Sequence, residues 1–146
     1  MIDWIKGLLG LDHNPFGLYY VYELKDPRYS PPRVFYVGKG RDARRYDHEE
    51  ETRAILGVGK GRDRAGKRAF GSRAMLLKHK HKVIIEIWDA GLEVMHGVVF
   101  RSDNPCAALR VEAEYINRVG LERLTNERFG DGKKALERCE KKERAA

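Results

Sequence analysis

Two aromatic runs near the start of the chain bring tyrosine hydroxyls close in sequence to a cationic segment. The runs are Gly17-Leu18-Tyr19-Tyr20-Val21-Tyr22 and Val34-Phe35-Tyr36-Val37-Gly38-Lys39-Gly40. Arg44 and His48 follow four residues apart, so on a helix they share a face and can reach one phosphate together. Hydrolysis of a phosphodiester needs a group that activates water and a cation beside the phosphate. These residue types therefore indicate phosphoryl chemistry.

A carboxylate that could hold a metal ion lies further along the chain. Glu112 sits at the margin of an apolar helical face, and Glu114 is the alternative. A carboxylate is a hard oxygen ligand that suits Mg²⁺, which keeps several waters and often takes only one or two protein carboxylates. A lone glutamate on a helix can equally serve solubility. Asn126, in Leu124-Thr125-Asn126, can equally end a helix.

The two aromatic runs predict a pair of strands that would position the tyrosines. Both runs are rich in aromatic and β-branched residues, and the breakers Asp26-Pro27 and Pro31-Pro32 lie between them. Along the first strand, alternation puts Tyr19 on one face and Tyr20 and Tyr22 on the other. A slip of one residue in register would thus exchange Tyr19 for Tyr20 or Tyr22 in the site.

Apolar periodicity and helix-start and helix-stop residues predict the other elements. We expect helices over 2–11, 41–56, 72–80 and 105–119, strands over 83–88 and 94–100, an exposed loop over 57–71 and a peripheral helix or frayed tail over 132–146. The predicted fold class is α+β, with a small antiparallel β-sheet of three to four strands flanked by helices. The whole chain, 1–146, forms one domain with its core over about 17–126, between an N-terminal helix and a peripheral C-terminal segment.

The charge of the chain indicates a polyanionic partner. Its net charge is +7 and its pI is near 9.5, which draws a protein chiefly to nucleic acid, with an anionic membrane surface as the competing partner. Candidate nucleic-acid-binding residues are Lys39, Arg41, Arg45, Lys60, Arg62, Arg64, Lys67 and Arg68. No apolar run approaches the length of a membrane-spanning helix, and no targeting segment is evident. We therefore expect a soluble, cytoplasmic protein with no membrane partner.

The cysteines and the remaining histidines do not indicate a metal centre. Cys106 and Cys139 have a spacing that fits neither a zinc site nor a disulfide framework, so both are expected to be thiols. His79 and His81 alternate with lysines, which favours a basic DNA-contacting edge. His96 is expected to be an ordinary residue of the fourth strand.

The order of these features resembles that of the GIY-YIG nucleases. Gly17-Leu18-Tyr19 and Tyr36-Val37-Gly38 match the two halves of the paired motif that names this family. Val37-Gly38-Lys39-Gly40 and Leu124-Thr125-Asn126 are similar to a divergent branch, that of the ankyrin/LEM-domain-type endonucleases. The resemblance implies a metal-dependent endonuclease that uses Mg²⁺ or Mn²⁺ to hydrolyse DNA. Its finer implications are structured or branched DNA as substrate and a role in DNA repair or recombination.

The resemblance also implies which residues act in catalysis, and by position these are Tyr19, Tyr36, Arg44, His48, Glu112 and Asn126. One tyrosine would help to activate the attacking water, and the other would support the phosphate or the metal-bound water. Glu112 would be the metal ligand. Because a tyrosine has an ordinary pKa near 10, it would need nearby cations to act as a base.

Two other functions fit the same composition. A basic nucleic-acid-binding module could keep the fold without catalysis, and Tyr36, Arg44 and Glu112 would then not need to converge in space. An RNA-binding or ribosome-associated protein would instead show aromatic stacking platforms on an open face of the sheet. The sequence leaves the oligomeric state open.

Overall fold

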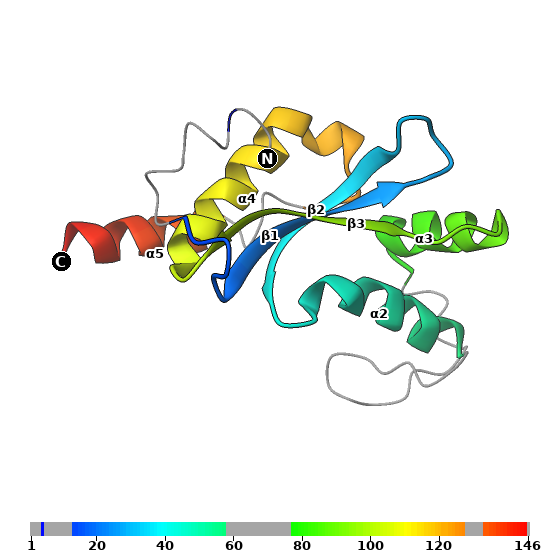
Figure 1. Ribbon diagram of the computed structural model, residues 1–146, viewed down its shortest axis with the longest axis horizontal. Coiled ribbons are helices and arrows are strands. Elements are labelled where there is room, and N and C mark those ends of the chain that lie inside the picture. Colours follow the sequence, from blue (N-terminus) through cyan, green and yellow to red (C-terminus); the bar gives the residue numbers. More distant parts are fainter. Residues whose placement is uncertain (1–3, 5–12, 58–76, 128–132, 146) are drawn as a thin grey trace.

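Three antiparallel strands form the sheet at the centre of the protein (Figure 1). They are β1 (Tyr19–Asp26), β2 (Arg33–Arg41) and β3 (Met95–Ser102), in the order β2-β1-β3. β1 pairs on both sides, so that Tyr22 lies opposite Gly38 of β2 and opposite Val98 of β3. The computed structural model describes residues 4, 13–57, 77–127 and 133–145.

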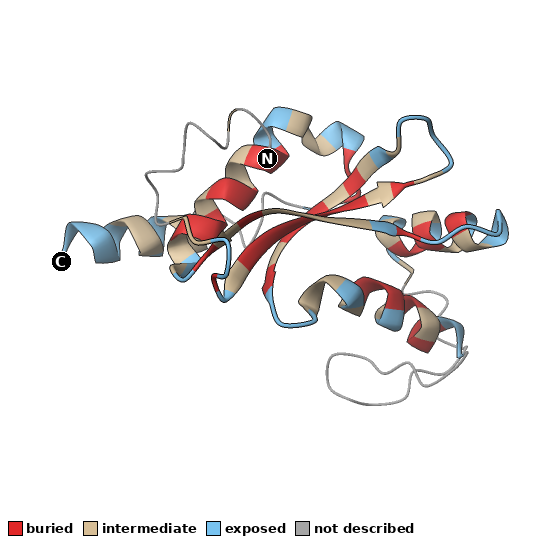
Figure 2. Cartoon of the chain, in the orientation of Figure 1, coloured by how far each residue is buried: buried red, intermediate tan, exposed pale blue. Residues whose placement is uncertain are grey.

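Helices cover both faces of this sheet. In chain order they are the 3₁₀ turn η1 (Arg44–Tyr46), α2 (Asp47–Leu56), α3 (His79–Asp89), α4 (Pro105–Val119), the 3₁₀ turn η3 (Leu121–Arg123) and α5 (Lys133–Arg144). α4 lies along one face, whereas α2 lies on the other side and packs against α3 (Figure 1). Buried residues line the sheet and the inward sides of α2 and α4 (Figure 2). The predicted α+β class is confirmed.

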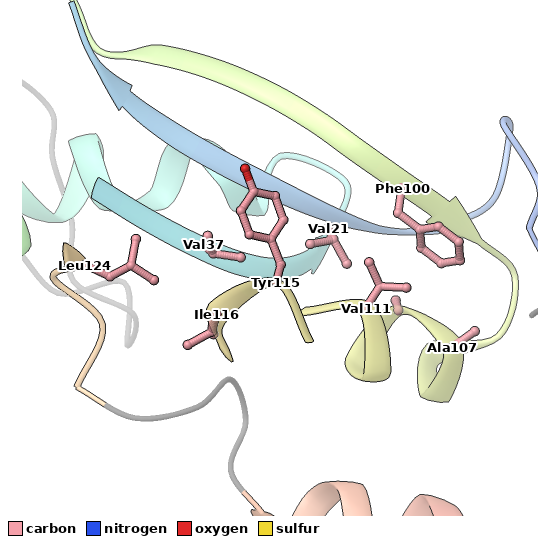
Figure 3. Packing of buried hydrophobic residues seen from close by; sticks show 9 residues of the cluster. Val21, Val37, Phe100, Ala107, Val111, Tyr115, Ile116 and Leu124 are labelled. Carbon is pink, nitrogen blue, oxygen red and sulfur yellow. The ribbon is translucent and has the colours of Figure 1, made fainter. Parts of the chain in front are cut away.

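Helix α4 combines good start residues with an apolar stripe. The Asn104 side chain accepts a hydrogen bond from the Cys106 N–H, and Pro105 occupies the first turn, where its missing N–H is not needed. The stripe packs on the sheet in one apolar cluster (Figure 3), which contains Val21, Val37, Phe100, Ala107, Ala108, Val111, Tyr115, Ile116 and Leu124. Complete burial of a large aliphatic side chain contributes about 1.5–3 kcal/mol, so this cluster holds α4 on the sheet.

The opposite face carries a second cluster, in which aromatic residues of β1 take part. This cluster contains Tyr20, Tyr22, Leu24, Phe35, Ile84, Ile87 and Val94. The alternation predicted for β1 is confirmed, because Tyr20 and Tyr22 belong to this cluster whereas Val21 and Tyr19 pack in the α4 cluster. The two faces of one strand thus enter two separate layers.

Residues 83–88, which we predicted to be a strand, belong to the C-terminal half of helix α3. The prediction was wrong because a short run rich in Ile, Val and Trp suits a buried helix as well as a strand. In the helix, Ile84 and Ile87 lie three residues apart on one face and are fully buried. The described sheet accordingly has three strands, and His96 lies in β3 and not in a fourth strand.

The helix predicted over 41–56 begins later than expected. Arg41 is the last residue of β2, Arg44 belongs to η1, and α2 begins at Asp47. Asp42 adopts a left-handed backbone conformation with φ of 52°, and this turns the chain out of β2. Gly57 follows the last residue of α2 in the left-handed conformation that glycine favours, so the predicted end of this helix at residue 56 is confirmed.

A disulfide joins Cys106 of α4 to Cys139 of α5, so the expectation of two thiols was wrong. The two residues are 33 positions apart, and their spacing in the sequence carries no information on how the last helix packs. An ion pair between Arg110 and Glu143 joins the same two helices. The C-terminal segment is therefore a peripheral helix fastened to α4.

Some predictions fall on residues outside the described part of the chain. They are the helix over 2–11, nearly all of the loop over 57–71 and the first half of the helix over 72–80. In the described ranges, no helix has the length and apolar character needed to cross a membrane.

Candidate active site

Two glycines of the edge strand β2 leave room for side chains from β1 and η1 to approach its backbone closely. A Cβ atom on Gly38 would stand 2.6 Å from the hydroxyl oxygen of Tyr22, and one on Gly40 would stand 2.6 Å from Cγ of Arg44. Both separations are too short for a side chain, so each position requires glycine for close approach. The Gly38-Lys39-Gly40 sequence therefore allows Tyr22 of β1 and Arg44 of η1 to reach over the edge strand.

Tyr22, Tyr36 and His48 form an aromatic cluster at this edge. The ring centroids of Tyr36 and His48 lie 4.3 Å apart, and the Tyr22 ring lies 6.1 Å from Tyr36 and 5.9 Å from His48. The Tyr22 hydroxyl oxygen is 2.5 Å from Nε2 of His48. The Tyr22 hydroxyl also opposes the rise in the pKa of Tyr36 that burial causes. β1, β2 and α2 thus bring three proton-carrying groups into one connected set.

Burial controls the protonation of this cluster. It lowers the pKa of His48 to about 3, and the positive charge of Lys80 adds to the effect, so the imidazole is neutral at neutral pH. Burial raises the pKa of Tyr36 to about 12, and the Glu112 carboxylate adds to that rise. The pKa of Tyr22 is also raised, mainly by burial. Both phenols therefore carry their protons at neutral pH.

Charged residues of α2 and α3 surround His48. Nζ of Lys80 lies 3.0 Å from Nδ1 of His48 and 3.4 Å from the Glu51 carboxylate. Nε2 of His81 lies 3.4 Å from the same carboxylate. Although burial opposes it, the hydrogen bond from His81 and the charge of Lys80 lower the pKa of Glu51 to about 2. Glu51 is therefore an anion that holds Lys80 beside His48.

Arg44 reaches the same edge from the turn η1. Its side chain is half-buried, and Nη1 lies 2.7 Å from Asp47 and 4.0 Å from Glu51. The charge of Arg44 opposes the rise in pKa that burial causes at Tyr22 and at Tyr36. The guanidinium is thus close to both phenols, and the acidic residues fix its orientation.

Glu112 approaches the phenols from the other layer of the fold. It lies on α4 next to the apolar stripe and is 4% exposed. Its negative charge adds to the effect of burial in raising the pKa of Tyr22 and of Tyr36. The charge of the carboxylate therefore acts on both phenols, although its helix covers the opposite face of the sheet.

The acidic groups fit an ion that needs few protein ligands. Within residues 13–57, 77–127 and the described C-terminal helix, no group of three or more His, Cys, Asp or Glu side chains is arranged to share an ion. Mg²⁺ keeps several of its waters and often takes only one or two carboxylates. Glu112 is a buried carboxylate whose charge raises the pKa of two phenols, whereas Glu114 points outwards and pairs with Arg118 at 2.9 Å. Glu112 is the better fit of the two.

Asn126 acts on the site through the backbone of β2. Its side chain accepts a hydrogen bond from the Val37 N–H at 3.1 Å and donates one to the Val37 carbonyl at 2.7 Å. The N–H and the hydroxyl of Thr125 both donate to the Phe35 carbonyl. This segment therefore pairs with the outer side of β2 and fixes the strand beside Tyr36. Helix termination does not describe that arrangement, and the catalytic role that the resemblance implies for Asn126 stays a prediction.

The structure places Tyr22, and not Tyr19, in the aromatic cluster. Tyr19 packs in the α4 cluster on the opposite face. Tyr20 lies on the correct face, but its hydroxyl donates to the Asp42 carbonyl and accepts from the Arg45 N–H. Tyr20 thus fastens the turn that leads into η1. Of the three tyrosines that the sequence offered, Tyr22 is the one that joins Tyr36 and His48.

Three of the predicted nucleic-acid-binding residues lie in the described part, around the end of β2. Lys39 and Arg45 are half-buried, and Arg41 is exposed. The Arg45 guanidinium stands over the Tyr46 ring at 5.0 Å from its centroid. The other candidates, Lys60, Arg62, Arg64, Lys67 and Arg68, lie outside the described residues.

Lys80 and Glu51 are site residues that the sequence analysis missed. The alternation of Lys and His over 78–82 favoured a basic DNA-contacting edge in the sequence analysis. On a helix, Lys80 shares a face with Ile84 and Ile87, four and seven residues later. Helical periodicity is therefore the signal that could have placed Lys80 inside.

A family model described as a LEM-3-like GIY-YIG domain matches residues 32–146. The match begins after β1 and covers β2 and every later element. It includes Tyr36, Arg44, His48, Glu112 and Asn126. No curated protein and no solved structure matches the chain.

Proposed function

We propose that this chain, which belongs to the LEM-3-like GIY-YIG domain family, is a metal-dependent endonuclease that hydrolyses phosphodiester bonds in DNA. Membership of the family implies a nuclease-type function. The observation that carries the finer proposal is the convergence of Tyr22, Tyr36, Arg44 and His48 with the buried Glu112 at the edge of β2.

Arg44 is suited to bind the scissile phosphate. Its planar guanidinium can make two parallel hydrogen bonds to phosphate oxygens. Asp47 holds its side chain at 2.7 Å, so little conformational freedom is lost when a phosphate is bound. The half-buried setting strengthens its attraction for an anion relative to a fully exposed arginine.

Tyr36 is the proposed partner of the attacking water, and Tyr22 supports it from inside the protein. Both phenols are protonated at neutral pH, so a negative charge on either oxygen needs stabilisation by cations. Arg44 supplies one cation, and Lys80 supplies another at 5.5 Å from the centre of the Tyr36 ring. Glu112 would hold Mg²⁺ or Mn²⁺, which when bound supplies Lewis-acid stabilisation of charge on the phosphate oxygens.

Lys39, Arg41 and Arg45 are proposed to hold the DNA backbone beside the site, with structured or branched DNA as the substrate. A binding module without catalysis needs such basic residues, but it does not need a buried carboxylate beside two buried phenols. The convergence of Tyr36 and Glu112 therefore favours an enzyme. An RNA-binding sheet is disfavoured because helices cover both faces of the described sheet.

A nicking assay on labelled duplex, flapped and branched DNA tests this function. The full chain should cleave when Mg²⁺ or Mn²⁺ is present and should stop when EDTA removes the ion, with flapped or branched DNA cut faster than plain duplex. Binding to all three DNAs without cleavage in either ion would identify a binding module instead. Cleavage that survives EDTA would contradict the metal dependence.

A further inference from the structure

The ammonium group of Lys80 lies inside the site and not on the protein surface. Its side chain is 12% exposed, although it comes from the first turn of α3, which belongs to neither aromatic strand. The neighbouring Lys78 and Lys82 are exposed. Lysine is almost never fully buried unless it is paired, so the interactions of Lys80 should explain its placement.

The direction of the hydrogen bond between Lys80 and His48 follows from the chemistry of the two groups. An ammonium has three donors and no acceptor, and a neutral imidazole has one nitrogen that donates and one that accepts. Nδ1 of His48, at 3.0 Å from Nζ, must therefore accept from Lys80. The proton of the neutral imidazole then lies on Nε2. Burial lowers the pKa of His48 to about 3, so the doubly protonated ring does not compete at neutral pH.

We propose that Lys80 is a positioning residue of this site: it holds His48 as the Nε2–H tautomer and thereby makes the Tyr22 oxygen a hydrogen-bond acceptor. Nε2 lies 2.5 Å from that oxygen, so its proton is directed at Tyr22. The hydrogen of Tyr22 is then free to point towards Tyr36, whose ring centroid lies 6.1 Å from that of Tyr22 and whose pKa the Tyr22 hydroxyl acts to lower. The donors run in one direction from Lys80 through His48 and Tyr22 to Tyr36.

Glu51 and Tyr36 keep Lys80 in the position that this arrangement requires. Nζ lies 3.4 Å from the Glu51 carboxylate and 5.5 Å from the centre of the Tyr36 ring, a distance typical of a cation–π contact. Burial lowers the pKa of Lys80, and Glu51 opposes that change. The carboxylate thus favours the charged ammonium, which can only donate.

The direction of these hydrogen bonds matters for the proposed nuclease function, on which the inference rests. Donors that start at a cation and end at Tyr36 favour negative charge as it develops on the Tyr36 oxygen. In the Nδ1–H tautomer, Nε2 would accept a hydrogen bond from Tyr22, whose hydrogen would then point to His48 and away from Tyr36. Lys80 therefore acts on Tyr36 through His48 and Tyr22.

The tautomer of His48 can be measured without DNA or metal, from long-range ¹H–¹⁵N spectra of the full chain at neutral pH. Wild-type His48 should show the Nε2–H pattern, and the variant His48→Gln assigns its signals among the five histidines. Lys80→Met, which removes the donors, should populate the Nδ1–H tautomer, and Lys80→Arg should keep Nε2–H. Lys82→Met, an exposed site on the same helix, is the matched control. Should Lys80→Met fail to fold, Glu51→Gln loosens Lys80 and should shift the same pattern.

An Nδ1–H pattern in the wild type, or an unchanged pattern when Lys80 or its Glu51 partner is altered, would overturn the inference. Single-turnover cleavage gives the second measurement. Lys80→Met should slow it by about 10–100-fold with unchanged DNA affinity, and Lys80→Arg should restore much of the rate. A shifted tautomer with an unchanged rate would also overturn the positioning role. A wild type that never cleaves DNA would overturn the proposed function alone, because the tautomer result does not depend on cleavage.

Discussion

The two faces of the sheet are built from alternate residues of the same strands, but different interactions hold them. On the α4 face, Val21, Val37 and Ile116 are completely buried among other apolar side chains. On the α2 and α3 face, Tyr22 and His48 are buried just as deeply, but each makes a hydrogen bond. The first face depends on apolar area and the second also on hydrogen-bond geometry.

This difference separates stability from chemistry in a small fold. Apolar burial has no preferred direction and tolerates small shifts, whereas a hydrogen bond weakens steeply when its angle or length is wrong. A buried polar group left without a partner costs about 1–3 kcal/mol. Two polar groups on the α4 face depart from this division. The Tyr115 hydroxyl donates a hydrogen bond to the buried Glu23, and the charge of Glu112, beside the apolar stripe of α4, raises the pKa of Tyr36 on the other face.

Of the variants considered, Glu112→Gln should lower the rate of DNA cleavage the most. Cleavage should fall by at least about two to three orders of magnitude, while DNA affinity stays nearly intact because the proposed role is metal ligation. Single-turnover cleavage and a binding titration measure the two quantities. Glu114→Gln, two residues along the same helix, is the control. Full activity in Glu112→Gln together with a loss in Glu114→Gln would move the metal ligand to Glu114.

Arg44→Lys should damage the polar edge next most strongly. The variant keeps the charge but replaces the planar fork with a point charge, so the single-turnover rate should fall by about 10–100-fold. Arg53→Lys is the control, since Arg53 lies on the neighbouring helix α2 and pairs with Glu50 at 2.8 Å. Wild-type turnover in the lysine variant would show that Arg44 is only a surface residue.

Ile116→Ala should have the opposite effect: it should lower the stability of the fold and leave the rate of cleavage unchanged. Ile116 is completely buried in the α4 cluster, so its truncation should lower the free energy of unfolding by about 2–5 kcal/mol. The rate of cleavage by the folded fraction should not change. Urea unfolding gives the first quantity, and single-turnover cleavage at low temperature gives the second. A large loss of rate in the folded protein would mean that the α4 cluster also sets the geometry of the site.

Acid should lower the free energy of unfolding through the α2 and α3 face, by less than Ile116→Ala does. The pKa of His48 is lowered from 6.5 to about 3 and that of Glu51 from 4.5 to about 2. Because both values are depressed, each contribution to stability is complete above the ordinary pKa and is lost as the pH falls towards the lowered one. The loss above pH 4.5 belongs to His48 and should be of the order of 1–3 kcal/mol. Urea unfolding at several pH values should show it in the wild type and not in His48→Gln.

The hairpin and helix α4 could be predicted from the sequence because local signals agree there. Aromatic and β-branched runs flank proline breakers in the hairpin, and Asn104 and Pro105 start α4 where a helical apolar period begins. Helix α3 could not be predicted in this way, because the Ile-rich run 83–88 suits both a strand and a helix. The disulfide between Cys106 and Cys139 depends on how α5 packs, which no local pattern records.

The candidate site could be predicted in part. Tyr36, Arg44, His48 and Glu112 were proposed from their order in the chain, and they converge in the structure. Their catalytic roles stay predictions. The choice between Tyr19 and Tyr22 depended on which face of β1 meets α2. Lys80 was missed because the helical period that places it on one face with Ile84 and Ile87 was not recognised.

The most direct test of where the chemistry lies compares Tyr22→Phe with Tyr19→Phe in single-turnover cleavage. The two tyrosines are in the same strand but lie in different layers. Tyr22→Phe removes the hydroxyl that is 2.5 Å from His48, and the rate should fall by about a hundredfold or more. Tyr19→Phe should leave the rate unchanged. A normal rate in Tyr22→Phe, together with a large loss in Tyr19→Phe, would place the chemistry on the α4 face and contradict the assignment.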